Sequence, residues 1–326
     1  MTSTKNPREN ILKKSEDIEG ISIKGPWLDK DIELKSFIKS FKSIGFQASH
    51  LGIAIDIVRE MRKERATIFM SYTSNMVSSG LREIIAWLVK HKYIDVLVTS
   101  GGGIEEDIIK SYKPFILGSF YTNDVELREK GINRIGNILV PNDRYIWFES
   151  FMQEIFDKVL ELQRERGKPL QPSEIIKILG ENISDEHSVL YWAARNNIPI
   201  YCPPFLDGSL GDMYYFYKQN HPEIDIAMGG DHKELIDRAL NAEKLGLIIL
   251  GGATPKHQVI NAALFRGGAD YAVYLSTGTE YDGSLSGAKP TEGMSWGKIN
   301  KKARAIFIEG DATITFPLLV IGGFID

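Results

Sequence analysis

Short apolar runs alternate with helix-like segments along most of the chain. Six runs are rich in β-branched or aromatic residues and predict strands at residues 66–72, 93–98, 198–202, 246–250, 270–275 and 305–308. A weaker strand candidate lies at residues 225–228. Most of these runs lead into a turn rich in small residues and then into a helical pattern. This order predicts an α/β fold with a parallel sheet flanked by helices.

Helical periodicity accounts for much of the rest. Apolar residues between positions 29 and 63 predict two helices that are broken near Gly45. Other helices are expected at residues 81–90, from 104, 142–166, from 173, 185–197, 231–244, after 257 and 312–320. Asp311 is positioned to cap the last helix, although Pro317 interrupts its pattern. Residues 1–24 are polar and charge-rich and are expected to form a mobile arm, whereas no linker is expected between residues 65 and 326.

Composition limits the class of protein. The 326 residues are 43% hydrophobic and 25% charged, and the net charge of −4 argues against nucleic-acid binding. Cys202 is the single cysteine of the sequence, which excludes an internal disulfide and a multi-cysteine zinc site. No metal site is expected. No signal peptide or run long enough for a membrane span is found. We therefore expect a cytoplasmic protein without membrane or nucleic-acid partners.

The turns after the strands carry residues suited to ligand binding. In an open parallel sheet such turns gather at the carboxyl edge, where amides at helix N-termini bind phosphates. The turns lack Gly-x-Gly-x-x-Gly spacing, and residues 283–289 lack P-loop spacing. Polar groups at or near the strand ends are Asn75, Glu105, Glu106, Asp207, Asp212, His257, Glu292 and Asp311. With Trp296 nearby they suit a ligand that carries several ammonium groups, although each residue alone is better explained as a helix cap or a solvated side chain, and it is their shared position at strand ends that favours a ligand.

Residues 280–299 form a loop rich in glycine and charge. Lys298 lies between Gly297 and Ile299, two residues after Trp296. Apolar neighbours there would desolvate its ammonium group, lower its pKa and provide an amine nucleophile for imine chemistry. The alternative interpretation is a charged surface loop with one more solvated lysine.

Seven parts of the sequence, in the same order, resemble the deoxyhypusine synthase family. They are YTSN at 72–75, VTSGGGIEED at 98–107, GINRIGN at 131–137, DGSLGDM at 207–213, ILGG at 249–252 with KH at 256–257, GADYAVY at 268–274 and SWGKI at 295–299. The similarity runs from about residue 25 to the C-terminus.

The resemblance implies a Rossmann-like parallel sheet flanked by helices, with residues 25–326 forming a single NAD-binding catalytic domain. It also implies a homotetramer with active sites between two subunits. The family uses NAD to oxidise spermidine and passes the aminobutyl group, through an imine on an enzyme lysine, to one lysine of the hypusine-bearing translation factor. Lys298 matches that enzyme lysine, and His257 matches a histidine near the reacting amine that can accept a proton.

The same resemblance assigns the remaining site residues. The polyamine would contact Glu105, Asp212, His257, Gly283, Ser284, Glu292 and Trp296. NAD would contact Ser74, Asn75, Ser100, Gly101, Gly102, Glu106, Asp207, Gly252, Thr277, Gly278, Asp311 and Ala312.

Three positions depart from the family pattern. Leu285 stands where eukaryotic members have an acidic residue that helps to hold a substrate amine. Ala253 replaces a third glycine, and Gln258 replaces a second histidine. These differences concern the donor and acceptor amines more than the NAD chemistry. Two alternatives therefore remain open: homospermidine synthase-type transfer to a small polyamine, and a sensor that binds NAD or polyamine without turnover. The presence of both Lys298 and His257 argues against the sensor.

Overall fold

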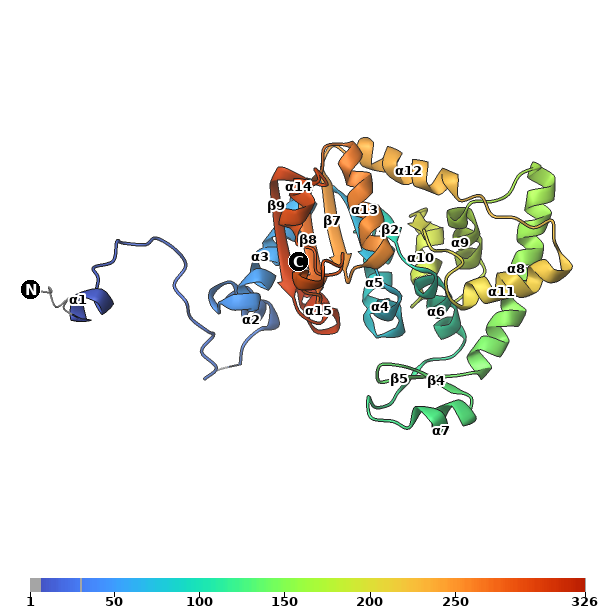
Figure 1. Ribbon diagram of the computed structural model, residues 1–326, viewed down its shortest axis with the longest axis horizontal. Coiled ribbons are helices and arrows are strands. Elements are labelled where there is room, and N and C mark those ends of the chain that lie inside the picture. The colour runs from blue at the N-terminus through green and yellow to red at the C-terminus, as the bar shows by residue number, and fades with distance from the viewer. Residues whose placement is uncertain (1–6, 30, 326) are drawn as a thin grey trace, which may run out of the picture.

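A parallel sheet of six strands forms the centre of the computed structural model, which describes residues 7–29 and 31–325. The strand order is β6-β2-β1-β7-β8-β9 (Figure 1). The strands are β1 (Thr67–Tyr72), β2 (Val96–Val98), β6 (Ile200–Tyr201), β7 (Leu245–Leu250), β8 (Ala269–Ser276) and β9 (Ile299–Glu309). The direction of chain progression reverses between β1 and β7, as in doubly wound dinucleotide-binding folds. The predicted α/β class and parallel sheet are confirmed.

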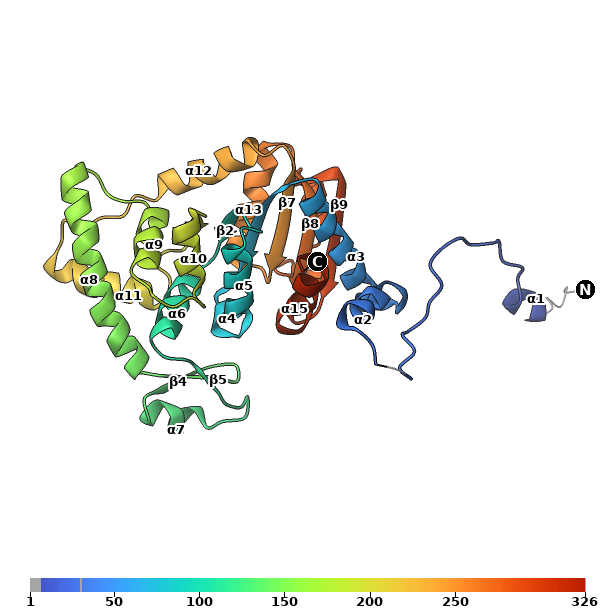
Figure 2. The same ribbon diagram turned by 180° about the vertical axis from the view of Figure 1, so that it is seen from behind.

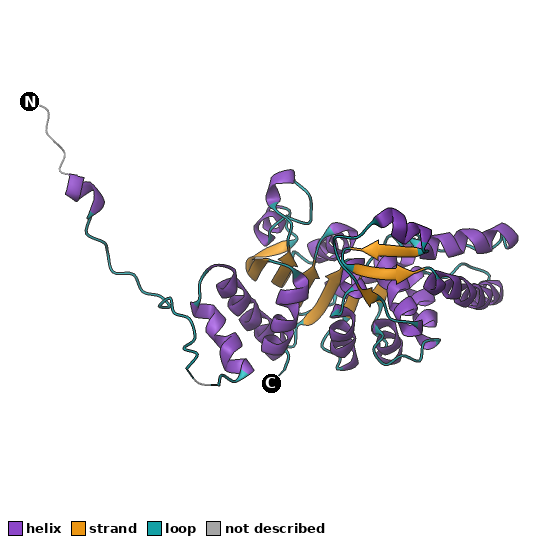
Figure 3. Cartoon of the chain, turned by 90° about the horizontal axis from the view of Figure 1, so that it is seen from below, coloured by secondary structure: helices purple, strands orange, loops and turns teal. Residues whose placement is uncertain are grey.

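Alternate strand residues fill two apolar cores on opposite faces of the sheet. On β7, Ile248 and Leu250 belong to one core, whereas Leu247 and Ile249 belong to the other. Because both faces are covered, the strands appear in the sequence as continuous apolar runs. The helices that cover the first face are α2 (Leu34–Ser40), α3 (Phe46–Lys63), α5 (Leu81–Lys90) and α15 (Ala312–Gly323). Those on the second face are α12 (Gly229–Leu240), α13 (Ala253–Phe265) and α14 (Pro290–Ser295), and Figure 3 shows helices on both sides of the strands.

Two expected helix ends are confirmed. The short 3-10 helix η1 (Phe41–Ser43) and Gly45, with a φ of 102°, separate α2 from α3. The Asp311 carboxylate accepts a hydrogen bond from the backbone N–H of Thr313 at 2.8 Å and so caps α15. Pro317 lies inside this helix without ending it.

Further helices follow β1 and β6 along the chain or lie between β2 and β6. They are α4 (Ser74–Ser78), α6 (Gly101–Tyr112), α8 (Asp143–Arg166), α9 (Pro172–Glu181), α10 (Val189–Asn196) and α11 (Ser209–Asn220). The helix expected from residue 185 begins four residues later, because the Ser188 side chain caps it by accepting from the N–H of Tyr191. The strand expected at residues 225–228 is wrong, since only a single bridge joins Leu170 to Ile226. The N–H groups of residues 225 and 226 bond to side chains instead of to a neighbouring strand.

A second, small sheet escaped the sequence analysis. It is antiparallel, in the order β3-β5-β4, and consists of β3 (Ile116–Leu117), β4 (Ile132–Ile135) and β5 (Ile138–Pro141) next to the helix α7 (Asp124–Glu129). Its strands are short and mostly not fully buried, so their apolar runs are too short to predict strands. This sheet and α7 lie together at one side of the molecule (Figure 1, Figure 2).

The N-terminal segment projects away from the rest of the chain (Figure 1, Figure 3). It contains the short helix α1 (Pro7–Ile11), and residues 11–25 are exposed. The backbone N–H of Lys24 donates to the carbonyl of Ser43 at 2.8 Å, where the segment joins the body. Residues 1–6 of the expected arm lie outside the described residues, and its mobility stays a prediction. Within residues 7–29 and 31–325, no helix has the length and apolar character needed to cross a membrane.

Candidate active site

The turns after β1, β2 and β6 pack together at the carboxyl edge of the sheet. A Cβ atom built on Gly101 would lie 2.1 Å from the carbonyl oxygen of Asp207. A Cβ atom on Gly102 would lie 2.7 Å from the Cβ of Ser74. Both glycines open α6, directly after its N-cap Ser100. Glycine is therefore required here because the neighbouring turns leave no room for a side chain.

The turns after β7 and β8 continue this row. A Cβ atom on Gly252 would lie 2.3 Å from the Oγ of Ser286, and one on Gly278 would lie 2.8 Å from the carbonyl carbon of Ser286. Gly251, with a φ of 80°, lies against Thr73 in the turn after β1. The expected convergence of the turns at the carboxyl edge is thus observed.

This row of turns fits an extended ligand that carries phosphates. The N-termini of α6 and α13 open onto it, and the glycines allow a ligand to approach the backbone. Most residues expected to contact NAD lie in these turns or in the first two helical turns after them. They are Ser74, Asn75, Ser100, Gly101, Gly102, Glu106, Asp207, Gly252, Thr277 and Gly278. Asp311 and Ala312 follow β9, at the opposite edge of the sheet from Asp207, which follows β6.

Two buried carboxyl groups on α6 lie beside the row. Glu105 accepts a hydrogen bond from the N–H of Leu210 at 2.7 Å, but burial, reinforced by the negative charge of Asp212, raises its pKa to about 7. Burial likewise raises the pKa of Glu106 to about 8, against the opposing hydrogen bond from the Ser78 hydroxyl. Both groups are partly protonated at neutral pH, and a bound cation would favour their charged forms.

Lys298 lies in a different environment, directly before β9. Its side chain is buried, as expected, and its Nζ lies 5.4 Å from the centre of the Trp296 ring. Burial and then the nearby positive charge of Lys298 lower the pKa of His257 on α13. Asn261 Nδ2 lies 3.1 Å from Nδ1 of His257. His257 is therefore neutral near pH 7 and can accept a proton next to Lys298.

A cavity of about 30 Å³ adjoins Lys298, and its lining includes Lys256, Tyr274, Leu285, Glu292 and Trp296. Lys256 is 1% exposed and donates hydrogen bonds to the carbonyl oxygens of Leu285 at 2.6 Å and Ala288 at 2.7 Å. Its Nζ lies 4.6 Å from the centre of the Tyr274 ring, and burial lowers its pKa to about 8. Neither Lys256 nor Tyr274 is among the site residues expected from the sequence, although Lys256 precedes His257 and Tyr274 lies in an expected strand.

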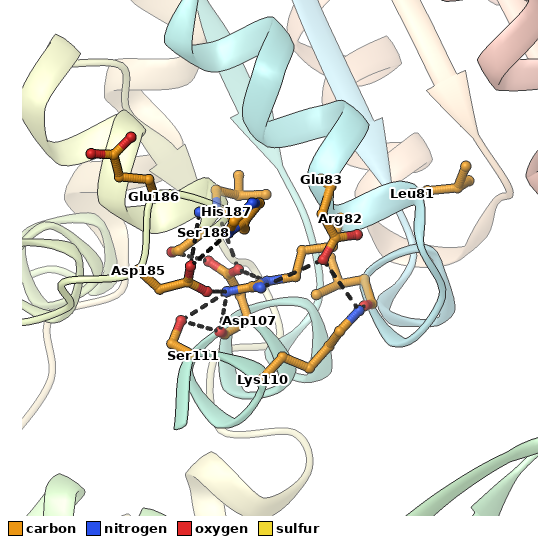
Figure 4. A network of polar contacts seen from close by, with 12 residues as sticks. Leu81, Arg82, Glu83, Asp107, Lys110, Ser111, Asp185, Glu186, His187 and Ser188 are labelled. Atoms are coloured by element: carbon orange, nitrogen blue, oxygen red, sulfur yellow. Dashed lines mark hydrogen bonds and ion pairs between the residues drawn. The ribbon is translucent and has the colours of Figure 1, made fainter. Parts of the chain in front are cut away.

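A buried polar network holds α6 in place (Figure 4). Arg82 on α5 donates to Asp107 Oδ1 at 2.5 Å and to Asp185 Oδ2 at 2.7 Å. Asp107 also accepts from the Ser188 hydroxyl at 2.7 Å and from the N–H of Leu190 at 2.8 Å. Because Asp107 directly follows the two buried glutamates on α6, the network fixes the helix that carries them.

The expected polyamine contacts fall into two groups. Glu105 and Asp212 lie on α6 and α11, whereas His257, Gly283, Ser284, Glu292 and Trp296 lie on α13 and in the segment before β9. Strands β1, β7 and β8 separate β2, which leads to Glu105, from β9. Glu105 and the segment before β9 therefore do not follow neighbouring strands, and His257 follows β7, which lies between them in the sheet. Among residues 7–29 and 31–325, no group of three or more His, Cys, Asp or Glu could hold a metal ion.

The sequence and the structure of this chain are both similar to those of known proteins. The family model of deoxyhypusine synthase matches residues 36–322. The chain belongs to the deoxyhypusine synthase family. Proteins assigned as deoxyhypusine synthases are 54% identical in Pyrococcus furiosus, over 96% of this chain and 97% of the relative, and 56% identical in Methanocaldococcus jannaschii, over 95% and 98%. The crystal structure of a protein assigned as a deoxyhypusine synthase from Entamoeba histolytica is 27% identical, with a TM-score of 0.70 over 93% of this chain and 96% of that chain.

Proposed function

We propose that this member of the deoxyhypusine synthase family is an NAD-dependent aminobutyltransferase. It takes the aminobutyl group from spermidine and transfers it, through an imine on Lys298, to one lysine of the hypusine-bearing translation factor. The observation that carries the proposal is the environment of Lys298: a buried amine next to an indole ring, with a neutral histidine close by. Such surroundings suit an amine nucleophile.

The carboxyl-edge turns would hold the dinucleotide. The glycines at positions 101, 102, 252 and 278 leave the backbone open to it, and Asp207 or Asp311 would reach a ribose. When bound, NAD would accept a hydride from spermidine and later return one to the product. The raised pKa values of Glu105 and Glu106, caused by burial, fit carboxyl groups that ionise when a cationic ligand arrives.

The chain's own residues would perform the transfer. Lys298 attacks the carbon of the oxidised donor, so that a new C=N bond forms at Nζ while the bond to the departing amine breaks. His257 takes the proton that Lys298 loses and supplies one to the departing nitrogen. Glu292 and Trp296 hold the cationic chain by charge and by its contact with the indole face. The acceptor amine then attacks the same carbon and releases Lys298.

Borohydride trapping tests this proposal. Wild-type protein is incubated with NAD, isotopically labelled spermidine and either the translation factor or a small diamine as acceptor, and its peptides are then mapped by mass spectrometry. We expect an aminobutyl adduct on Lys298 and labelled translation factor. Lys298→Arg should abolish both, because a guanidinium keeps the charge but is not a nucleophile at neutral pH.

Lys301→Arg is the matched control, since Lys301 is an exposed lysine on the neighbouring strand β9. It should keep full transfer activity, and NAD binding should survive in both variants because the expected dinucleotide contacts lie in other turns. Full transfer by Lys298→Arg would show that the lysine is structural. Labelling of the diamine alone would favour a small-molecule polyamine synthase.

A further inference from the structure

Tyr274 presents a buried hydroxyl group that has no hydrogen-bond partner among the described residues. The residue lies on β8, is 2% exposed and lines the cavity next to Lys298. A Cβ atom built on Gly293, which also lines this cavity, would lie 3.9 Å from the Tyr274 hydroxyl oxygen. The hydroxyl therefore faces the space that Lys298 adjoins.

An unpaired buried hydroxyl destabilises the folded state, because it has lost its hydrogen bonds to water without replacement. Side chains of Ser71, Tyr72, Thr122 and Arg144 also contain buried atoms without partners, but these residues do not line the cavity of Lys298. A cavity of about 30 Å³ has room for roughly one water molecule or one amine group. The unpaired Tyr274 hydroxyl and Lys298 therefore line the same small cavity.

The surroundings hold the tyrosine ring in position. The Lys256 ammonium group lies 4.6 Å from the ring centre and is itself fixed by the carbonyl groups of Leu285 and Ala288. The ring cannot turn away from the cavity without disturbing these contacts. Burial raises the pKa of Tyr274 well above its usual range, so the hydroxyl keeps its proton at neutral pH and is able to donate it in a hydrogen bond.

We propose that Tyr274 is a further catalytic residue, whose hydroxyl donates a hydrogen bond to the Lys298 nitrogen when that nitrogen carries the aminobutyl group. This inference rests on the proposed function and adds a specific donor to it. When the acceptor amine adds to the imine carbon, a C–N bond forms and the electron pair of the C=N bond moves to the Lys298 nitrogen. That nitrogen takes up the proton that the acceptor amine releases. The hydrogen bond from Tyr274 stabilises the nitrogen as charge develops on it.

Tyr274→Phe removes the hydroxyl and preserves the ring. We expect the rate of transfer to the acceptor to fall by about 100- to 1,000-fold, the effect of removing one preorganised donor from an active site. The borohydride-trapped adduct on Lys298 should persist, because the step after its formation is the one slowed. NAD affinity should stay the same, and the melting temperature should be unchanged or higher, because an unpaired buried hydroxyl has been removed.

Tyr72→Phe is the matched control, because Tyr72 is a fully buried tyrosine on β1 whose hydroxyl also lacks a partner. Its melting temperature should likewise be unchanged or higher, but its rate of transfer to the acceptor should equal that of the wild type. Wild-type transfer by Tyr274→Phe, in an assay where Lys298→Arg is inactive, would overturn this inference and leave the proposed function intact. Absence of any Lys298 adduct in the wild-type protein would instead overturn both.

Discussion

At the scale of single residues, burial and partners decide what each charged group can do. Glu106 and Asp107 are adjacent acids on α6, and both are buried. Asp107 is paired with the Arg82 guanidinium, whereas burial raises the pKa of Glu106 to about 8. The first therefore stabilises the fold through its ion pair, and the second holds a proton that a cationic ligand can displace.

Glu106 gives a prediction for pH. The ordinary pKa is 4.5 and the folded value is about 8, so between these values the folded protein keeps a proton that the unfolded chain has lost. The free energy of unfolding should therefore fall as pH rises through this window. Glu106→Gln removes the titrating group, and its stability should decline less between pH 5 and 8, by roughly 1–3 kcal/mol, when urea unfolding is measured without NAD.

The control is Glu154→Gln, which changes an exposed glutamate on α8. It should follow the pH dependence of the wild type. If the curves of Glu106→Gln and wild type run parallel, Glu106 is ionised in the folded protein and the role given to its burial is wrong.

At the scale of elements, α6 joins the site to the rest of the fold. Its first residues form the turn against Ser74 and Asp207, and its second turn carries the two glutamates whose pKa values are raised by burial. Asp107 binds α5 and the start of α10 (Figure 4). The position of the acidic group therefore depends on a network of contacts with distant segments.

Asp107→Asn tests this connection. The change leaves the buried guanidinium of Arg82 without its closest carboxylate, and breaking a buried ion pair in this way costs about 3–5 kcal/mol. Guanidinium chloride unfolding should show a loss of that order. Asp237→Asn, which removes the exposed i,i+4 pair with Lys233 on α12, should cost no more than about 1 kcal/mol. Equal losses in the two variants would contradict the central place of the network.

At the scale of the whole molecule, the expected polyamine contacts around Glu105 are separated from those around Lys298. This separation suggests that each active site is completed by a second copy of the chain. Leu117 and Tyr121, in and beside the small antiparallel sheet, are 78% and 95% exposed, and Phe46 at the start of α3 is 96% exposed. Exposed apolar side chains such as these can be covered at contact sites between proteins. A second copy would cover such surface and bring Glu105 of one chain towards Lys298 of another, as the resemblance to the family implies.

We therefore predict a tetramer whose active sites contain residues from two chains. Light scattering should give four times the mass of one chain. Lys298→Arg and Glu105→Gln should each be inactive alone, but tetramers formed by both variants together should regain part of the activity, because some sites then contain both native residues. A stable, active monomer, or mixed tetramers without any regained activity, would contradict shared sites.

The sequence by itself predicted the parallel sheet, the helix boundary near Gly45 and the cap at Asp311. Each of these can be recognised from a local pattern: apolar runs, a turn residue or a capping side chain. The tertiary structure alone decided the ion pair between Arg82 and Asp185, which are 103 residues apart, and the unpaired hydroxyl of Tyr274 beside Lys298. The tertiary structure also decided the small antiparallel sheet and the single bridge at Ile226, where a strand was expected at residues 225–228. Their contacts join segments that meet only in the folded chain, so no local pattern records them.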